Sequence, residues 1–363
     1  MMKYKRQISI GISLILSIGA LYFAFKHVQI TELIHYLQSV QYVWFIPALF
    51  ISLLNFLLRV VRWQLILNPS IQLTFWECYH PLMIAFMMNC ILPGRVGELA
   101  RPFILNQKHQ FSFSAGLSTV AAERFFDLLI MLLLFLFTLL SIDIDPTKTV
   151  VFNEYQLNAA TLYSVSQRMI LICVIIMFGI LFFTIDRLRK AIIQIIRMIP
   201  HLLSFAGKRT QQILTEKFCI PLIHIIDHIA AGLSIVKSPR QALMCFLLSL
   251  IIWVLNVVIY KIIAIGCPNI HLTWYQWSAV MIIVCIFIAL PSVPGFWGLW
   301  EAGGVFAMGL FGIPEKEAFG FTLTNHFIQI FFTIILGIVS ASIIGVNIMK
   351  ISSGKSDDSG KIP

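Results

Sequence analysis

Apolar runs long enough to cross a bilayer alternate with short polar segments along most of this chain. Since an α-helix rises about 1.5 Å per residue, roughly 20 apolar residues cross the hydrocarbon core. Amphipathic stretches at 30–40 and 220–236 predict helices that lie along the membrane interface. The predicted fold class is all-α integral membrane, a polytopic helical bundle. Its membrane-spanning helices are expected at residues 8–25, 42–67, 114–142, 169–185, 241–264, 277–290 and 321–348.

Two further apolar segments, at about 79–105 and 292–311, are interrupted by helix-breaking residues. The first contains Asn-Cys-Ile-Leu-Pro-Gly-Arg-Val-Gly-Glu-Leu-Ala-Arg at 89–101, and the second contains Ala-Leu-Pro-Ser-Val-Pro-Gly-Phe-Trp-Gly-Leu-Trp-Glu at 289–301. Lipid tolerates a broken helix only where protein or a watery cavity surrounds it, so both segments predict re-entrant or half helices. The residues expected to form these two breaks are Pro93, Gly94, Gly97, Pro291, Pro294, Gly295 and Gly298.

Lysine and arginine residues predict how the chain is oriented in the membrane. They gather before the first span, throughout 186–217 and after the last span, which places the N-terminus and the C-terminus in the cytoplasm. Successive spans then cross the membrane in alternating directions only under two conditions. The first interrupted segment must enter and leave the membrane from the cytoplasmic side, and the second must return the chain to the outer side. Two halves of opposite topology make an inverted repeat, whose substrate site lies near the bilayer midplane.

One membrane domain is expected over residues 1–350. Its halves cover about 40–185 and 218–350, a basic cytoplasmic connection covers 186–217, and 351–363 form a disordered cytoplasmic tail. The basic connection is interpreted either as a solvated loop that only sets the topology or as a segment that binds anionic lipid.

Composition excludes a soluble protein. Hydrophobic residues make up 59% of the chain and charged residues 12%, whereas soluble domains average about 25% charged residues. Mean hydropathy is +0.90. The formal net charge of +10 suits loops that face anionic headgroups, so membrane lipid rather than nucleic acid is the expected partner.

Motifs that bind cofactors are missing from the sequence. The chain contains no nucleotide-binding glycine loop, no Gly-x-Ser-x-Gly nucleophile and no Cys-x-x-Cys pair. His224 and His228 stand four apart, yet Asp227 does not occupy the position of the acid in the metalloprotease motif. We therefore expect no cofactor, no metal site and no step driven by ATP within this chain.

The first break carries a concentration of polar side chains. Arg95, Glu98 and Arg101 are spaced three apart, which would place them along one helical face, and Asn89 precedes the break. A charge at membrane depth is costly unless it is paired or hydrated. These side chains are expected either to face a watery cavity or to form salt bridges that only hold the hairpin together.

A second charged cluster, Glu123, Arg124 and Asp127, lies inside the predicted span 114–142. Glu123 and Asp127 share a helical face, and Arg124 is three residues from Asp127, within pairing distance on a helix. Arginines faced by carboxylates suit a phosphate headgroup, because the guanidinium fork binds phosphate through two hydrogen bonds. The alternative is a structural ion network between packed helices.

The second break offers one carboxylate, Glu301, among apolar and aromatic neighbours. This side chain is interpreted either as the charged group that lines a site in this half or as an interfacial residue at the mouth of the hairpin. The nearby tryptophans are more typical of packing or of the interfacial belt than of a lipid gate. Other polar residues inside predicted spans are Asn55, Arg59, Arg62, Asn325, His326 and Gln329.

The two breaks resemble a known family. A Leu-Pro-x-Arg-x-Gly-Glu-x-x-Arg stretch begins at Leu92, Glu123-Arg124 follows with Asp127, and a Pro-Gly-x-x-Gly-x-x-Glu segment ends at Glu301. These features are similar to the lysylphosphatidylglycerol synthase transmembrane family, also called UPF0104, and the resemblance covers about residues 5–350. Family members often read Pro-Gly-Gly-x-Gly-x-x-Glu at the second break, where this chain has Pro-Gly-Phe-Trp-Gly-Leu-Trp-Glu.

The resemblance implies a flippase-like protein of the bacterial inner membrane that moves a phospholipid or lipid-linked headgroup between leaflets. Two-domain relatives also carry a cytosolic aminoacyl-transferase domain. This chain ends at Pro363, shortly after its last predicted span, so the synthase activity is not expected and the protein is not expected to be an enzyme.

The residues expected to bind the lipid headgroup come from both breaks and from the charged cluster. Three arginines would hold the phosphate, and the remaining polar residues would organise the cavity while the acyl chains stay in lipid. The predicted substrate-binding set is Asn89, Arg95, Glu98, Arg101, Glu123, Arg124, Asp127 and Glu301.

Two other functions remain open. A membrane glycosyltransferase that uses a polyprenyl-phosphate donor would employ Asp143 and Asp145 as catalytic acids, although the outer loop is short. A scaffold that assembles lipid-modifying enzymes would transport nothing and would tolerate replacement of the cavity charges. Neither the lipid nor self-association into oligomers is decided by the sequence.

Overall fold

The computed structural model describes most of the two predicted halves and parts of the connection between them. The described residues are 30–92, 95–141, 150–152, 155–157, 186–202, 214–223, 226–227, 238–290 and 293–345, with the single residues 19, 22, 167, 171 and 212. The predicted spans 8–25 and 169–185 and the predicted tail 351–363 lie outside these residues, apart from single positions.

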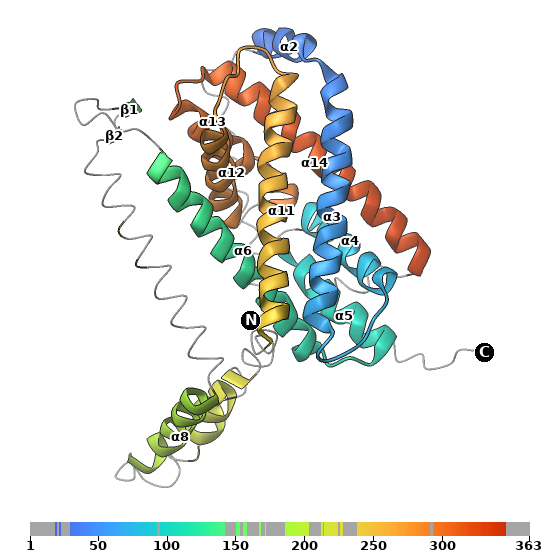
Figure 1. The fold of residues 1–363 in the computed structure, drawn as a ribbon, viewed down its shortest axis with the longest axis vertical. Coiled ribbons are helices and arrows are strands. Elements are labelled where there is room, and N and C mark those ends of the chain that lie inside the picture. The colour runs from blue at the N-terminus through green and yellow to red at the C-terminus, as the bar shows by residue number, and fades with distance from the viewer. Residues whose placement is uncertain are drawn as a thin grey trace.

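The chain folds as an all-α membrane protein, as predicted (Figure 1). Three of the described helices are long and apolar enough to cross a membrane, namely Tyr42–Leu67, Pro239–Ile265 and Glu315–Ile344. Large apolar side chains such as Phe50, Leu247 and Phe331 stand exposed on these helices. Exposed apolar side chains of this size are expected on helices that face lipid rather than water.

The described elements include two pairs of shorter helices, α4 with α5 and α12 with α13. The only described strands are β1 and β2, an antiparallel pair with Val150 opposite Leu157. The elements are α2 (Ile30–Ser39), η1 (Tyr42–Trp44), α3 (Phe45–Leu67), α4 (Phe75–Ile91), α5 (Gly97–His109), α6 (Phe113–Ser141), β1 (Val150–Phe152), β2 (Tyr155–Leu157), α8 (Asp186–Leu202), η4 (Thr215–Cys219), α11 (Pro239–Ile265), α12 (Trp274–Ala289), η6 (Pro294–Phe296), α13 (Leu299–Gly309) and α14 (Glu315–Ile344).

The order α3–α4–α5–α6 is repeated as α11–α12–α13–α14. In each set a long helix is followed by a broken pair of shorter helices and then by another long helix. Both broken pairs begin with related residues, Ile-Gln-Leu-Thr-Phe-Trp-Glu at 71–77 and Ile-His-Leu-Thr-Trp-Tyr-Gln at 270–276. In both, the threonine N–H donates to the side chain three residues later, over 2.7 Å to Glu77 and 2.8 Å to Gln276. These capping boxes start equivalent helices in the two halves.

The two halves run in opposite directions. The N–H of Gln41, just before α3, donates to the carbonyl of Gly266, at the end of α11, over 2.8 Å. At the far end of α14, the carbonyl of Ile344 accepts a hydrogen bond from Lys108 of α5 over 3.1 Å. Figure 1 shows α3 and α11 side by side, α4 and α5 near one end of the bundle, and α12 and α13 near the other. The inverted arrangement predicted from the spans is therefore present.

Glycines allow helices to approach closely, both between the two halves and within the second half. A Cβ on Gly337 of α14 would collide with the side chain of Met87 on α4, and one on Gly304 of α13 would collide with Thr322 of α14. Small residues at such crossings let membrane helices gain van der Waals contact along their backbones. The tight contact of α14 with α4 brings the two broken pairs together in the middle of the protein.

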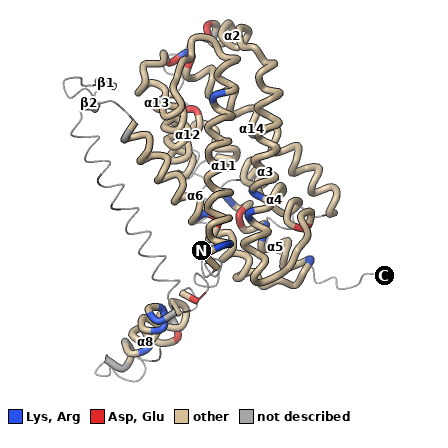
Figure 2. Tube along the Cα trace, in the orientation of Figure 1, with Lys and Arg blue, Asp and Glu red and all other residues tan. Residues whose placement is uncertain are grey.

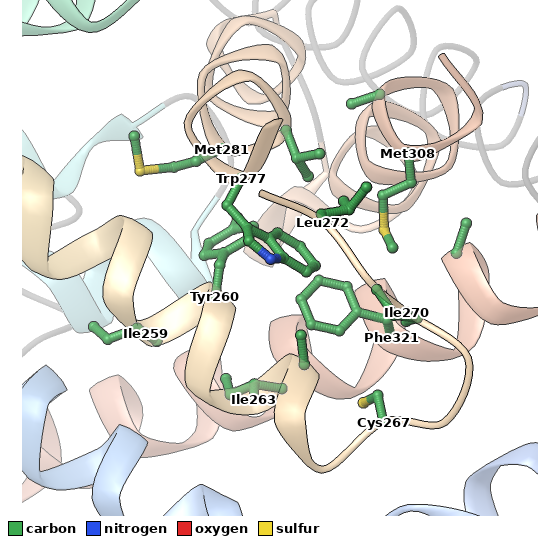
Figure 3. Close-up of a cluster of buried hydrophobic side chains, with 14 of the residues drawn as sticks. Ile259, Tyr260, Ile263, Cys267, Ile270, Leu272, Trp277, Met281, Met308 and Phe321 are labelled. Atoms are coloured by element: carbon green, nitrogen blue, oxygen red, sulfur yellow. The ribbon is translucent and has the colours of Figure 1, made fainter. Parts of the chain in front are cut away.

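An apolar and aromatic core supports the second broken pair (Figure 3). The ring centroids of Trp277 and Phe321 lie 4.9 Å apart, and Tyr260 completes the group from α11. Ile270 and Leu272, from the loop before α12, close the cluster on one side. This packing fixes α11, α12 and α14 relative to one another and so fixes one wall of the cavity described below.

Several sequence predictions about single elements were wrong. Arg95 does not share a helical face with Glu98 and Arg101, because α5 begins only at Gly97 and Arg95 adopts a left-handed φ of 54°. The segment after Asp186 is not a loop, since α8 runs to Leu202. The last helix begins six residues earlier than its predicted start, at Glu315 rather than at residue 321, because the polar first turn hid its beginning.

Candidate functional site

A cavity of about 260 Å³ lies where the two broken pairs meet. Both halves contribute to its walls, which combine aromatic rings such as those of Phe56 and Phe332 with amides such as those of Asn256 and Gln329. Such a mixture, largely apolar with a few polar groups, is typical of small-molecule sites. The ionisable side chains that line it besides tyrosine and cysteine are Arg59, Arg95, Glu98, Arg101 and Arg124.

The first break is held by Asn89 and Arg95. The Asn89 side-chain oxygen accepts a hydrogen bond from the N–H of Gly97, the first residue of α5, over 2.8 Å. A Cβ at Gly97 would collide with the carbonyl oxygen of Ala85, so only glycine lets α5 begin this close to α4. Pro93 and Gly94, also predicted to form this break, lie outside the described residues.

Equivalent positions of the two breaks touch each other across the cavity. In the two Pro-Gly-x-x-Gly stretches, Arg95 and Phe296 occupy the same position, and both adopt a left-handed φ, 54° and 61°. The guanidinium carbon of Arg95 lies 5.8 Å from the centroid of the Phe296 ring. Its Nη2 also donates to the carbonyl of Ile288, at the end of α12, over 2.9 Å. Strained backbone of this kind is found mainly where function requires it.

A buried ion network lies beside the cavity between α3, α5 and α6. Arg62 donates to Asp127 over 2.6 Å and also bonds Ser249, while Arg101 pairs with Glu123. Arg62 is fully buried, and Glu123 and Asp127 are nearly so. Figure 2 shows blue and red positions close together in this part of the bundle. Buried charges persist only when they are paired and hydrogen-bonded, so removing one partner of this network would leave another charge buried without compensation.

Arg124 links the network to the cavity. Its Nη2 lies 3.3 Å from Asp127, and its Nη1 lies 4.0 Å from Glu98. Both Arg124 and Glu98 line the cavity, whereas Glu123 and Asp127 do not. The two carboxylates of α6 therefore position the arginines from behind rather than contact anything in the cavity.

Two cavity arginines have no carboxylate partner. Among the residues that the structure describes, no Asp or Glu oxygen lies within 4.0 Å of Arg59 or Arg95. Arg59 donates to the Asn55 amide oxygen over 2.9 Å, and its guanidinium lies between the rings of Phe86 and Trp253. Within the described part of the chain, Arg95 is held by a carbonyl oxygen and by a ring. Two positive charges therefore face a largely apolar space without forming an ion pair among the described residues, and Glu98, the carboxylate that lines this space, lies 4.0 Å from Arg124.

The second break is organised by Glu301 and His326, both fully buried. Glu301 accepts a hydrogen bond from the N–H of Gly298 over 2.7 Å and lies 2.5 Å from Nδ1 of His326. His326 Nε2 lies 2.8 Å from the carbonyl oxygen of Gly295. Gly295 and Gly298 have φ of 72° and 87°, which explains why glycine stands at both positions. Pro291, predicted to belong to this break, lies outside the described residues.

The structure brings together most, but not all, of the predicted site. Of the predicted substrate-binding set, the residues that line the cavity are Asn89, Arg95, Glu98, Arg101 and Arg124. Glu301 neither lines the cavity nor sits at an interface. Its side chain points into the protein because it caps α13 and binds His326.

Two important arginines were not assigned to the site from the sequence. Arg59 lines the cavity, and Arg62 is the main partner of Asp127. Their signal was the spacing of Asn55, Arg59 and Arg62 at i, i+4 and i+7 on a membrane helix. A polar stripe at that spacing marks the face that turns away from lipid.

No group of three or more potential metal ligands occurs among the residues for which the structure gives positions. His224 and His228 lie outside them, as do Asp143 and Asp145, the acids of the glycosyltransferase alternative. The expectation of no metal site at the two histidines and the alternative role of the two aspartates as catalytic acids therefore stay predictions from the sequence.

Comparisons with known proteins identify relatives of this chain. The family described as lysylphosphatidylglycerol synthase TM region matches residues 9–337. A UPF0104 membrane protein of Methanocaldococcus jannaschii is 24% identical over 267 residues, covering 72% of this chain and 96% of that protein. No solved structure matches this chain.

Proposed function

This chain belongs to the lysylphosphatidylglycerol synthase transmembrane family, and we propose that it moves a membrane lipid with a phosphate-containing headgroup between leaflets. The headgroup would occupy the cavity between the two breaks while the acyl chains remain in the surrounding lipid. The location in a bacterial inner membrane, with both chain ends in the cytoplasm, stays a prediction from the sequence.

The unpaired arginines are the observation that supports this proposal most strongly. Arg59 and Arg95 place two positive charges in a membrane-embedded cavity without a carboxylate partner among the described residues. Ionisable groups inside membranes are costly and usually mark a substrate path. A phosphate bound between two guanidinium groups would supply the missing negative charge and accept several charge-assisted hydrogen bonds.

The inverted repeat supports movement rather than storage of the lipid. In transporters built this way, broken helices from two oppositely oriented halves meet at a central site, and one half rocks against the other to expose it to either side. Here α4–α5 and α12–α13 are such pairs, and Arg95 and Phe296 at their breaks touch each other across the cavity.

Leaflet exchange in liposomes tests the proposed function. We expect purified protein to exchange labelled phosphatidylglycerol, lysyl-phosphatidylglycerol or a polyprenyl-phosphate sugar. Arg59→Gln and Arg95→Gln should each slow exchange at least about tenfold, because a lost charge-assisted hydrogen bond is worth roughly 1.5–3 kcal/mol. Arg240→Gln, at an exposed position at the start of α11, serves as the matched control and should leave exchange unchanged. Folded protein that exchanges none of the three lipids, or arginine variants as active as the control, would contradict the proposal.

The basic helix α8 supports contact with an anionic membrane surface. Ile196 packs against Cys219 and Ile226, while Leu188 and Ile195 stay 43% and 59% exposed. Basic residues interleave with this apolar stripe, and Figure 2 shows α8 as a concentration of blue positions. Amphipathic helices of this composition lie in the headgroup region of anionic leaflets.

Amide hydrogen exchange would detect this contact. In lipid nanodiscs, we expect α8 to exchange more slowly with phosphatidylglycerol than with phosphatidylcholine, since each basic residue near an anionic surface contributes about 1 kcal/mol. Replacing Arg187 and Lys190 together by glutamine should remove most of that difference. Equal exchange in the two lipids would show that α8 is a solvated connection.

A further inference from the structure

The hydrogen bonds around Glu301 and His326 fix the number of protons that the pair holds. A carbonyl oxygen only accepts, so the contact of His326 Nε2 with Gly295 requires a hydrogen on Nε2. The second oxygen of Glu301 accepts from the N–H of Gly298. Nδ1 and the first carboxylate oxygen then face each other at 2.5 Å, a distance that two lone pairs cannot share without a proton between them. The pair therefore holds one proton more than a carboxylate beside a neutral imidazole.

We infer that Glu301 and His326 form a proton-binding site that couples the movement of the lipid to the movement of a proton. This inference rests on the proposed function, and it names the ion whose gradient would drive transport. The pair ties α13 and the second break to α14, so the protonated pair corresponds to the arrangement seen in the structure.

The surroundings of His326 favour the protonated pair. The Trp300 ring stacks on the imidazole with centroids 4.4 Å apart and an interplanar angle of 9°, and the Trp297 ring lies 4.5 Å away. Indole faces attract cations, so both rings are placed to contact the imidazole of His326 when it carries the extra proton. Trp300 and Phe296 also line the cavity, so a ligand in the cavity would contact the residues that surround the pair.

Loss of the proton would free the second break. A neutral imidazole has only one N–H, so His326 could then donate either to Glu301 or to the carbonyl of Gly295 but not to both, and the buried pair would carry a net negative charge. The titratable groups that line the cavity together with Trp300 and Phe296 are Arg59, Arg95, Glu98, Arg101, Arg124, Cys90, Cys285 and Tyr260. None of them is hydrogen-bonded or ion-paired with Glu301 or His326 among the interactions of the described residues. The link between α13 and α14 would therefore weaken, and the break could move.

Glu301→Gln tests this directly because it preserves the geometry. A glutamine oxygen can accept from Gly298 and its amide group can donate to Nδ1 of a neutral His326, so both hydrogen bonds remain while no proton can leave. His80→Gln is the matched control, since His80 also stacks on an indole, with its ring centroid 5.9 Å from that of Trp76, but lies near the start of α4.

The measurement is leaflet exchange in liposomes with an imposed pH gradient, together with internal pH reported by a trapped dye. We expect the gradient to change wild-type exchange at least about fivefold, the lower end of common coupling, with proton flux alongside. Glu301→Gln should lose both effects and His80→Gln should keep both. Wild-type exchange that ignores the gradient and moves no protons would overturn the coupling while leaving the proposed function intact.

Absence of exchange in wild-type protein would count against the proposed function itself, and a second readout then decides the proton site. Infrared difference spectra of the purified protein between about pH 5 and 8 should contain a carboxyl band that disappears in Glu301→Gln and persists in His80→Gln. Identical spectra of wild-type protein and Glu301→Gln would show that the pair never exchanges its proton.

Discussion

Replacing Asp127 by asparagine should destabilise this protein by about 3–5 kcal/mol, the usual cost of breaking a buried ion pair. Asp127 accepts from Arg62 and from the indole of Trp253, over 2.6 and 3.0 Å, and pairs with Arg124. Asparagine has nearly the same shape but no charge, and its NH2 group donates where one carboxylate oxygen of Asp127 accepts. Arg62 would then stay fully buried with Glu123 as its remaining carboxylate partner, which Arg101 also uses.

Detergent-induced unfolding, followed by circular dichroism, would measure this loss. Glu98→Gln is the matched control, because Glu98 lies 4.0 Å from Arg124 and its side chain is 26% exposed, so its contribution should be below about 1 kcal/mol. Replacing Arg62 by methionine and Asp127 by leucine together should recover much of the stability, since an apolar pair needs no compensation. An Asp127→Asn variant as stable as Glu98→Gln would show that the network is not a structural requirement.

Gly97→Ala should distort the first break. The added Cβ would collide with the carbonyl oxygen of Ala85 and with the side chain of Asn89, and neither the helical backbone nor the bonded amide can move aside cheaply. Overpacking of this kind costs up to about 3 kcal/mol. The hydrogen bond from Gly97 to Asn89 would lengthen, and Arg95, two residues earlier, would shift away from Phe296.

Both thermal stability and leaflet exchange report on this change. We expect Gly97→Ala to lower both, whereas Leu99→Ala, at an exposed position on the same helix, should change neither by much. Wild-type stability and leaflet exchange in Gly97→Ala would mean that neither property depends on the close contact between α4 and α5.

Hydrophobic patterning predicted the helices and the breaks because both follow from local chemistry. A run such as 241–264 can satisfy its backbone in lipid only as a helix, and α11 covers it. Proline and glycine are clustered at 93–97 and 291–298, and the structure has no regular helix through either stretch that it describes, although single prolines such as Pro81 and Pro102 lie inside α4 and α5. The inverted order of the halves then followed from the positions of the basic residues.

Contacts between distant residues could not be predicted in the same way. Arg62 and Asp127 are 65 positions apart, and nothing local to either residue indicates that they form a pair. The sequence shows that Glu301 is an unusual residue for its surroundings. It does not show the partner of Glu301, because that partner is a histidine 25 positions later on another helix. Arg95 was assigned to a helical face since spacing alone does not show that the helix begins two residues later.

The two halves also resemble each other in sequence outside the breaks, in the residues that precede α4 and α12. The stretches 71–77 and 270–276 share isoleucine, leucine and threonine at the same positions, with two aromatic residues and a Glu or Gln after them. The similarity has a structural reason, because each stretch caps the N-terminus of the first helix of a broken pair. Aligning the halves from these capping boxes, rather than from proline and glycine alone, pairs α4 with α12 directly.

The contact between Arg95 and Phe296 has a consequence for how the two halves relate. These residues hold the same place in each half and meet where the halves face each other. Two identical subunits related by a twofold axis would have to set arginine against arginine there, or phenylalanine against phenylalanine. In one continuous chain the two equivalent positions can carry different residues. The two copies of this position therefore pair a cation with a ring, where a symmetric dimer with arginine there would set two like charges against each other.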